Sequence, residues 1–115
     1  MSKVITSPVK KWAGTVTLAD PLTLPQAEAI EAYFRHEIDP ALIDKNGRLS
    51  FLEMDKPKMP VLFACVEKWQ LADIPEDVNE QTFPHSPSKA RHELVDWLYE
   101  EIVKIYLGES EIPNE

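Results

Sequence analysis

The last third of the chain carries the pattern that most constrains the fold. Ser86 suits the N-cap of a helix, and Pro87 is tolerated in the first turn. Apolar residues then recur every three or four positions, the spacing of one helix face; they are Ala90, Leu94, Trp97, Leu98, Ile102 and Ile105. Gly108 is a candidate for the left-handed cap that ends such a helix. The pattern predicts a helix over residues 87–107, about 31 Å long, against which the rest of the chain must pack.

Two shorter helices are predicted before it. Thr23 and Gln26 have the spacing of a capping box, and the helix that they start is expected to run to about Glu37. Its predicted apolar stripe consists of Ala27, Ile30, Phe34 and Ile38. Pro60 opens the second helix, which is predicted over Val61–Leu71. Because this helix is apolar nearly all round, we expect it to lie at the centre of the core.

The remaining segments predict only a small β element. Trp12–Leu18 alternates β-branched and apolar residues, as a short strand does. A turn at Asp44–Gly47 and a second short strand at Arg48–Leu52 are one interpretation of the segment that follows the first helix. Residues 72–85 are expected to form a surface loop, packed by Ile74, Val78 and Phe83.

These elements predict an α+β fold that is mainly helical, with three helices, the last one long, and a small β element. The chain has 115 residues, 43% hydrophobic and 28% charged, which suits one globular domain. We expect that domain over residues 12–108. A flexible or extended arm, 1–11, is expected before it, and a frayed acidic tail, 109–115, after it.

The charge and the apolar runs limit the class of protein. The net charge of −8 opposes binding to nucleic-acid phosphates, and it suits a basic partner or simply solubility. The N-terminus lacks an apolar stretch of signal-peptide length, and the longest apolar run, Met59–Val66, is too short to cross a bilayer. The only cysteine, Cys65, has no partner for an internal disulfide. We therefore expect a cytoplasmic protein without membrane contact.

One segment, Leu42–Glu53, resembles an EF-hand calcium loop when it is aligned on Gly47. Four of its ligand positions carry oxygen donors: Asp44, Asn46, Ser50 and Glu53. The first position, which needs an aspartate oxygen, is Leu42. We predict no calcium binding and interpret the segment as a turn in which Gly47 supplies a positive φ.

The other reactive side chains are weak candidates for chemistry. Cys65 lies in an apolar segment, which favours a buried structural thiol over a nucleophile. His92 and Asp96 lie four apart on one helix face, but two ligands do not make a metal site, and we interpret them as surface polar residues. The three glycines form no phosphate-binding loop. The sequence predicts no enzyme, no metal and no cofactor.

Three aromatic residues are the candidates for partner binding. Tyr99 and Tyr106 lie beside the apolar stripe of the last helix, where they either widen an interaction surface or cover the edge of the core. Trp12 lies between two lysines and the predicted strand. It anchors the arm either on its own domain, which we favour, or on a neighbouring protein.

Three segments, in this order along the chain, resemble a family of small acidic proteins encoded by long-tailed bacteriophages and prophages. The first is KWAGTVTL at Lys11–Leu18, with DPLT at Asp20–Thr23 and the Pro25-Gln26 helix start. The second is VEKW at Val66–Trp69, and the third is TFP at Thr82–Pro84. Such proteins are similar to tail assembly chaperones, which bind the helical tape-measure protein before the tail tube forms around it.

The resemblance implies a non-catalytic binding protein of the host bacterial cytoplasm. It would act as a tail assembly chaperone or a related tail accessory protein with the tape-measure protein as its partner. The alternative is an acidic, phage-encoded inhibitor that mimics DNA and occupies a host protein. A chaperone requires an apolar face, whereas a DNA mimic requires carboxylates along a continuous surface.

Overall fold

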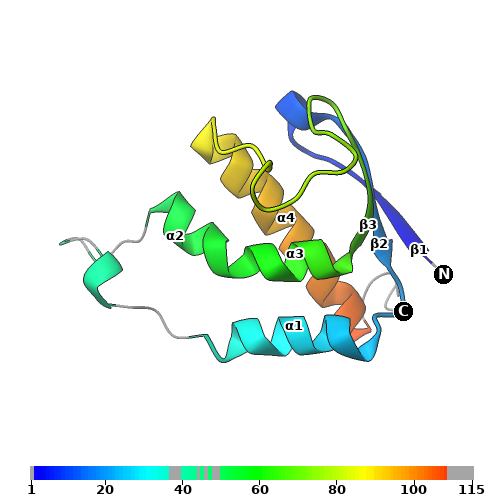
Figure 1. Ribbon diagram of the computed structural model, residues 1–115, viewed down its shortest axis with the longest axis horizontal. Helices are drawn as coiled ribbons and strands as arrows, with labels where there is room; N and C mark the ends of the chain where they lie inside the picture. The colour runs from blue at the N-terminus through cyan, green and yellow to red at the C-terminus, as the bar shows by residue number, and fades with distance from the viewer. Residues whose placement is uncertain (1, 37–39, 44, 46, 48–49, 109–115) are drawn as a thin grey trace, which may run out of the picture.

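The computed structural model describes residues 2–36, 40–43, 45, 47 and 50–108. It contains a three-stranded antiparallel sheet and helices that pack against one another beside it (Figure 1). Helices α2 (Phe51–Asp55) and α3 (Met59–Cys65) follow each other through the 3₁₀ turn Lys56–Lys58, so they form one continuous helical segment. With α1 (Leu24–Phe34) and α4 (Ser88–Leu107), this gives three helical bodies. The predicted fold class, α+β and mainly helical with a long last helix, is confirmed.

The long helix α4 forms where its apolar periodicity predicts it. Its buried apolar face consists of Leu94, Val95, Leu98, Ile102 and Ile105. Gly108 ends the helix in the left-handed conformation, with φ at 79°, as predicted. The start differs from the prediction, because the N-cap is Pro87 and no side chain caps the helix.

Helix α1 begins as the capping box predicts. The Thr23 backbone N–H donates to Gln26 Oε1 at 2.8 Å. The helix ends at Phe34, before the predicted end at Glu37, which lies outside the described residues together with Ile38. Ile30 is fully buried, but Phe34 is 53% exposed, so the predicted apolar stripe is wrong at Phe34.

The sheet has the order β1-β2-β3 and corrects two predictions. The predicted strand is β2 (Gly14–Ala19), and its partner on one side is β1 (Ser2–Thr6), which pairs Ile5 with Val16. The arm predicted over residues 1–11 is therefore part of the domain. Its short strand has little periodicity of its own and is stabilised by backbone pairing with β2.

The partner on the other side is β3 (Val66–Leu71), which corrects the predicted helix over Val61–Leu71. The helix ends at Cys65, and the next residues alternate, with Trp69 and Leu71 buried. Short apolar segments fit both periods, and here pairing with β2 decides the outcome. Gly14 permits this pairing, because a Cβ at its position would collide with the Gln70 carbonyl.

A further correction concerns Arg48–Leu52, where a short strand was one interpretation. Arg48 and Leu49 lie outside the described residues, and Phe51 and Leu52 begin α2. The Ser50 hydroxyl accepts a hydrogen bond from the Glu53 backbone N–H at 3.2 Å. Ser50 is therefore a helix N-cap, and capping decides the local structure.

The core lies between the sheet and the helices. Helix α3 packs against both α1 and α4, with the sheet beside them (Figure 1). The segment between β3 and α4 covers this core as a surface loop, and Ile74, Val78 and Phe83 are buried, as predicted. Cys65 is also buried, as predicted. Among the described residues, no helix is both long and apolar enough to cross a membrane.

Candidate functional site

The three predicted binding residues do not form one site. Trp12 is only 1% exposed and belongs to the core, within the 3₁₀ turn Lys10–Trp12. Its assignment as a partner-binding residue is therefore wrong. The indole is large and apolar, and burying it fixes β1 and its turn on the domain itself, which was the favoured alternative.

Tyr99 and Tyr106 lie together on the side of α4 that meets α1. The ring of Tyr99 packs edge-on against Tyr33, with the centroids 5.0 Å apart, and the Lys58 ammonium lies 5.2 Å from its centre. Burial, with a smaller contribution from Tyr33, raises the pKa of Tyr99 to about 12. The Tyr106 hydroxyl donates to Glu31 Oε2 at 2.6 Å, and this hydrogen bond is the first cause of its raised pKa. Both tyrosines are therefore neutral hydrogen-bond donors near pH 7.

Two aromatic residues of α1, and His36 just beyond its end, extend this surface. The ring centroids of Phe34 and Tyr106 lie 6.0 Å apart, and the His36 ring stacks on the Tyr33 ring with their centroids 5.8 Å apart. We call the set the α1–α4 aromatic surface; it consists of Tyr33, Phe34, His36, Tyr99 and Tyr106. Sequence reasoning placed Phe34 in the core, since its spacing from Ile30 matches a buried stripe. The helix end at Phe34 leaves its ring on the outside instead.

Two carboxylates of α1 and α4 are engaged by other side chains. Glu31 accepts from Tyr106 and lies 4.0 Å from the Arg35 guanidinium. Glu101 of α4 lies between Lys3, at 3.5 Å, and Lys104, at 3.2 Å. Glu31 of α1 and Glu101 of α4 are therefore both paired with basic side chains.

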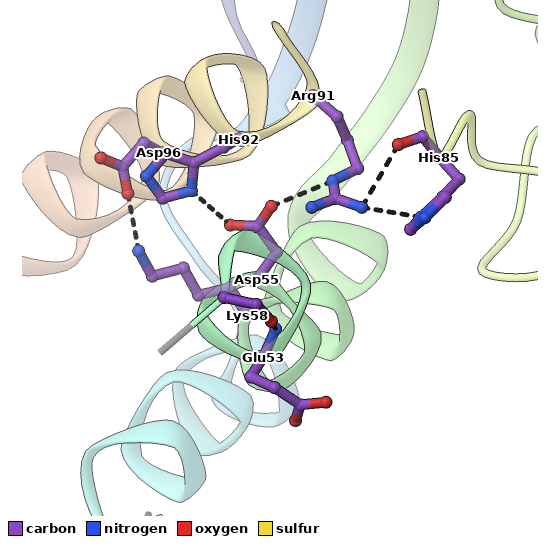
Figure 2. Close-up of polar contacts among 8 residues, drawn as sticks. Glu53, Asp55, Lys58, His85, Arg91, His92 and Asp96 are labelled. Carbon is purple, nitrogen blue, oxygen red and sulfur yellow. Dashed lines mark hydrogen bonds and ion pairs between the residues drawn. The ribbon is translucent and has the colours of Figure 1, made fainter. Parts of the chain in front are cut away.

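On its other side, α4 meets α2 through a network of charged groups that the sequence did not predict (Figure 2). Asp55 is 2% exposed; its Oδ2 accepts from Arg91 Nε at 3.1 Å, and its Oδ1 lies 2.8 Å from His92 Nδ1. Arg91 Nη1 lies 2.9 Å from His85 Nδ1. One signal for it exists in the sequence. Arg91 occupies the apolar stripe of α4, three residues before Leu94, and a buried cation requires a partner.

His92 and Asp96 have protein partners. His92 is bound to Asp55 and stacks on Phe51, with the centroids 4.5 Å apart. Asp96 accepts from Lys58 Nζ at 2.6 Å. The His92 side chain is only 19% exposed, which corrects its interpretation as a surface residue, whereas the Asp96 side chain is 43% exposed and lies at the surface as predicted. Within the described ranges, no three His, Cys, Asp or Glu side chains are grouped so that they could hold a metal ion.

The structure also bears on the predictions for Cys65 and for the EF-hand-like segment. Burial raises the pKa of the Cys65 thiol to about 11, so the sulfur is protonated near pH 7 and is a poor nucleophile. In the EF-hand-like segment, Gly47 has a φ of 77°, the positive value expected for a turn. Asp44 and Asn46 lie outside the described residues. Ser50 and Glu53 belong to the start of α2 instead of facing a common ion.

Comparison of the chain with protein-family models, with curated proteins and with solved structures found no match.

Proposed function

We propose that this domain is a non-catalytic binding protein that engages a helical protein partner through the α1–α4 aromatic surface. In this proposal it acts in the host bacterial cytoplasm as a phage tail assembly chaperone, or as a related tail accessory protein. Its partner is the tape-measure protein. The observation that carries the proposal is the exposed ring of Phe34 beside Tyr106.

Phe34 gives this surface the character of an interface. A phenylalanine that is half exposed leaves apolar area in water, and burying that area against a partner stabilises a complex. Its neighbours Tyr33, Tyr99 and Tyr106 add rigid rings that present both apolar area and hydroxyl groups, the side chains enriched at interfaces. The rings come from two helices, so a partner helix could lie across them with its apolar face.

The charge distribution supports a chaperone over a DNA mimic. A mimic needs unpaired carboxylates along a continuous surface, whereas Glu31, which accepts from Tyr106, also lies beside Arg35, and Glu101 of α4 is paired with Lys3 and Lys104. The net charge of −8 would then affect mainly the association rate with a basic partner. Apolar contacts would supply most of the affinity.

The candidate nucleophile gives no support to a catalytic function. Cys65 is fully buried, and its thiol is protonated at neutral pH. The Asp55 carboxylate is also enclosed, and both of its oxygens are engaged by Arg91 and His92. We therefore propose binding and no reaction.

Co-expression with the tape-measure protein encoded in the same phage or prophage tests the proposal. A stable complex should form, and raising the salt from about 0.05 to 0.5 M should weaken it only modestly, because apolar contacts are not screened. Tyr106→Ala should accelerate dissociation. Val4→Ala, which removes an exposed apolar side chain from β1, away from the proposed surface, is the control and should have no effect.

The DNA-mimic alternative predicts the opposite pattern. The domain would then capture a DNA-binding host protein, with a steep salt dependence and no sensitivity to Tyr106. That outcome, together with no complex with the tape-measure protein, would exclude the chaperone function.

A further inference from the structure

A cavity of about 360 Å³ lies beside the charged network, away from the α1–α4 aromatic surface. It is formed by α2, the start of α3, the loop before α4 and the first turn of α4. Its apolar lining consists of Leu52, Met59, Phe83 and Pro84. Arg91 and Asp55 also line it, so a buried charged pair adjoins an apolar space large enough for part of a ligand.

Arg91, which lines this cavity, has an incomplete set of hydrogen bonds. Its Nε donates to Asp55, and its Nη1 bonds to the ring and the carbonyl of His85. Its Nη2 is buried and has no hydrogen-bond partner among the described residues, although Arg91 as a whole is only 3% exposed. Unpaired buried donors are rare in folded proteins, so Nη2 is the group in this region that most lacks an acceptor.

The surrounding charges indicate what kind of acceptor fits. Asp55 already balances the charge of Arg91, and Glu80 adds a second carboxylate to the lining. Lys56 also lines the cavity, but its ammonium lies 3.9 Å from Glu53. Among the described residues that line the cavity, both cations thus already have a carboxylate partner, so an anionic ligand would meet carboxylates. A neutral carbonyl oxygen would satisfy Nη2 without adding charge.

We propose that this cavity binds one apolar side chain of a partner polypeptide, together with the adjacent backbone carbonyl, which accepts a hydrogen bond from Arg91 Nη2. The side chain packs against Leu52, Met59 and Phe83. Nη2 is closed to water in the free protein, so the bond forms after a small shift of the guanidinium or of the loop side chains over it. The inference rests on the proposed function, because it assigns a second contact to a protein partner.

A nuclear magnetic resonance titration of the full chain with N-acetyl-L-leucine methylamide tests the cavity directly. This probe carries one apolar side chain and neutral carbonyls. Saturable shifts are expected at the Arg91 Nε–H signal and at the methyl groups of Leu52 and Met59. N-acetylglycine methylamide, which lacks the side chain, should bind at least about tenfold more weakly.

Two variants connect the shifts to the cavity. Leu52→Glu places a carboxylate at a position that is 40% exposed on the cavity lining, and it should weaken probe binding at least about tenfold. Leu24→Glu makes the same change at an exposed position of α1 and is the matched control. Arg91→Lys keeps the charge and removes Nη2; if this variant does not fold, Leu52→Glu still decides the result.

Three outcomes would overturn the inference. They are the absence of saturable shifts at the cavity up to about 50 mM probe, equal binding of the glycine and leucine probes, and tighter binding of N-acetyl-L-leucine, a carboxylate. The last would make the cavity an anion site. The titration uses no tape-measure protein, so its result is separate from the proposed function. If the probe binds but no tape-measure complex forms, only the proposed function fails. Only the cavity inference fails if three results occur together: the tape-measure complex forms, Leu52→Glu leaves that complex intact, and no probe binds.

Discussion

Helix α4 is held on its two sides by different kinds of contact. Towards α2 it meets a buried carboxylate, Asp55, that engages Arg91 and His92 at hydrogen-bond distance. Towards α1 it meets half-buried and exposed rings, among them Tyr99 and Phe34. The first side excludes water and depends on the geometry of each bond, whereas the second leaves apolar area in water.

Because of this difference, we expect substitutions on the two sides of α4 to affect different properties, folding stability on one side and partner binding on the other. Removing one partner of a buried charge pair leaves the other charge without compensation, so the cost falls on folding. Removing an exposed ring leaves no cavity and no unpaired charge, so the cost falls on whatever the ring contacts in a complex. Lys58 joins the two sides, since its ammonium binds Asp96 and lies over the Tyr99 ring. We predict that substitutions on the α2 side change the free energy of unfolding, and that those at exposed rings change partner affinity.

The largest effect is expected at Asp55. Asp55→Ala should lower the free energy of unfolding by about 3–5 kcal/mol, because Arg91 would remain buried without its counter-charge. Urea denaturation followed by tryptophan fluorescence measures it. Asp96→Asn, in the more exposed pair with Lys58, is the control and should cost less than about 1 kcal/mol. Equal costs for the two variants would contradict the claim that the buried pair, and not the exposed one, stabilises this side of α4.

A smaller effect is expected for Tyr99, at the boundary between the two regions. Tyr99→Ala should lower the free energy of unfolding by about 1–3 kcal/mol, because the edge contact with Tyr33 and the contact with Lys58 are lost. Tyr99→Phe keeps the ring and should change the free energy of unfolding little. If both variants were equally destabilised, the hydroxyl and not the ring would matter there.

Cys65 tests the core that both regions share. Cys65→Ala should cost about 1 kcal/mol or more through a small cavity, and it should leave partner binding intact. The folded thiol keeps its proton to about pH 11, above its ordinary pKa of 9.0, so stability should fall as the pH rises from 9 to 11. The stability of the Cys65→Ala variant should fall less over that pH range. Rapid labelling of the native protein by a thiol reagent would show instead that the sulfur is accessible.

The smallest effect is expected from calcium, which should stabilise neither region. Leu42 stands where a calcium loop needs an aspartate oxygen, so millimolar calcium should not raise the melting temperature beyond the effect of ionic strength. A site with a dissociation constant below about 100 μM would add more than about 1 kcal/mol at that concentration. A shift of that size, lost in Glu53→Gln, would show that Leu42 does not prevent binding.

The helices and the sheet differ in how far the sequence predicted them. Helices α1 and α4 have local signals, a capping box at Thr23 and a left-handed cap at Gly108, so their existence was predicted and only their ends moved. Strands β1 and β3 depend on pairing with β2. The sequence of Val66–Leu71 was therefore interpreted as a continuation of the preceding helix, because nothing in that segment indicates that it can pair with the distant strand β2.

The same distinction applies to the candidate site. Tyr99 and Tyr106 could be placed beside the buried face of α4 from their spacing alone. Trp12 could not, because nothing within its segment shows that the core covers it. The network around Asp55 joins residues that are 36 positions apart, Asp55 and Arg91, and only the fold brings them together. Arg91 carries the one local signal of this network, because its charge lies on the apolar stripe of α4.

The central claim is that binding depends on an exposed ring that folding does not need. Its most direct test is to measure, for Phe34→Ala, both the affinity for the tape-measure protein and the free energy of unfolding, with Leu24→Ala as the control. We predict at least a tenfold loss of affinity, about 1.4 kcal/mol, with the free energy of unfolding unchanged within about 0.5 kcal/mol. Unchanged affinity, or a loss of stability as large as the loss of binding, would contradict the account.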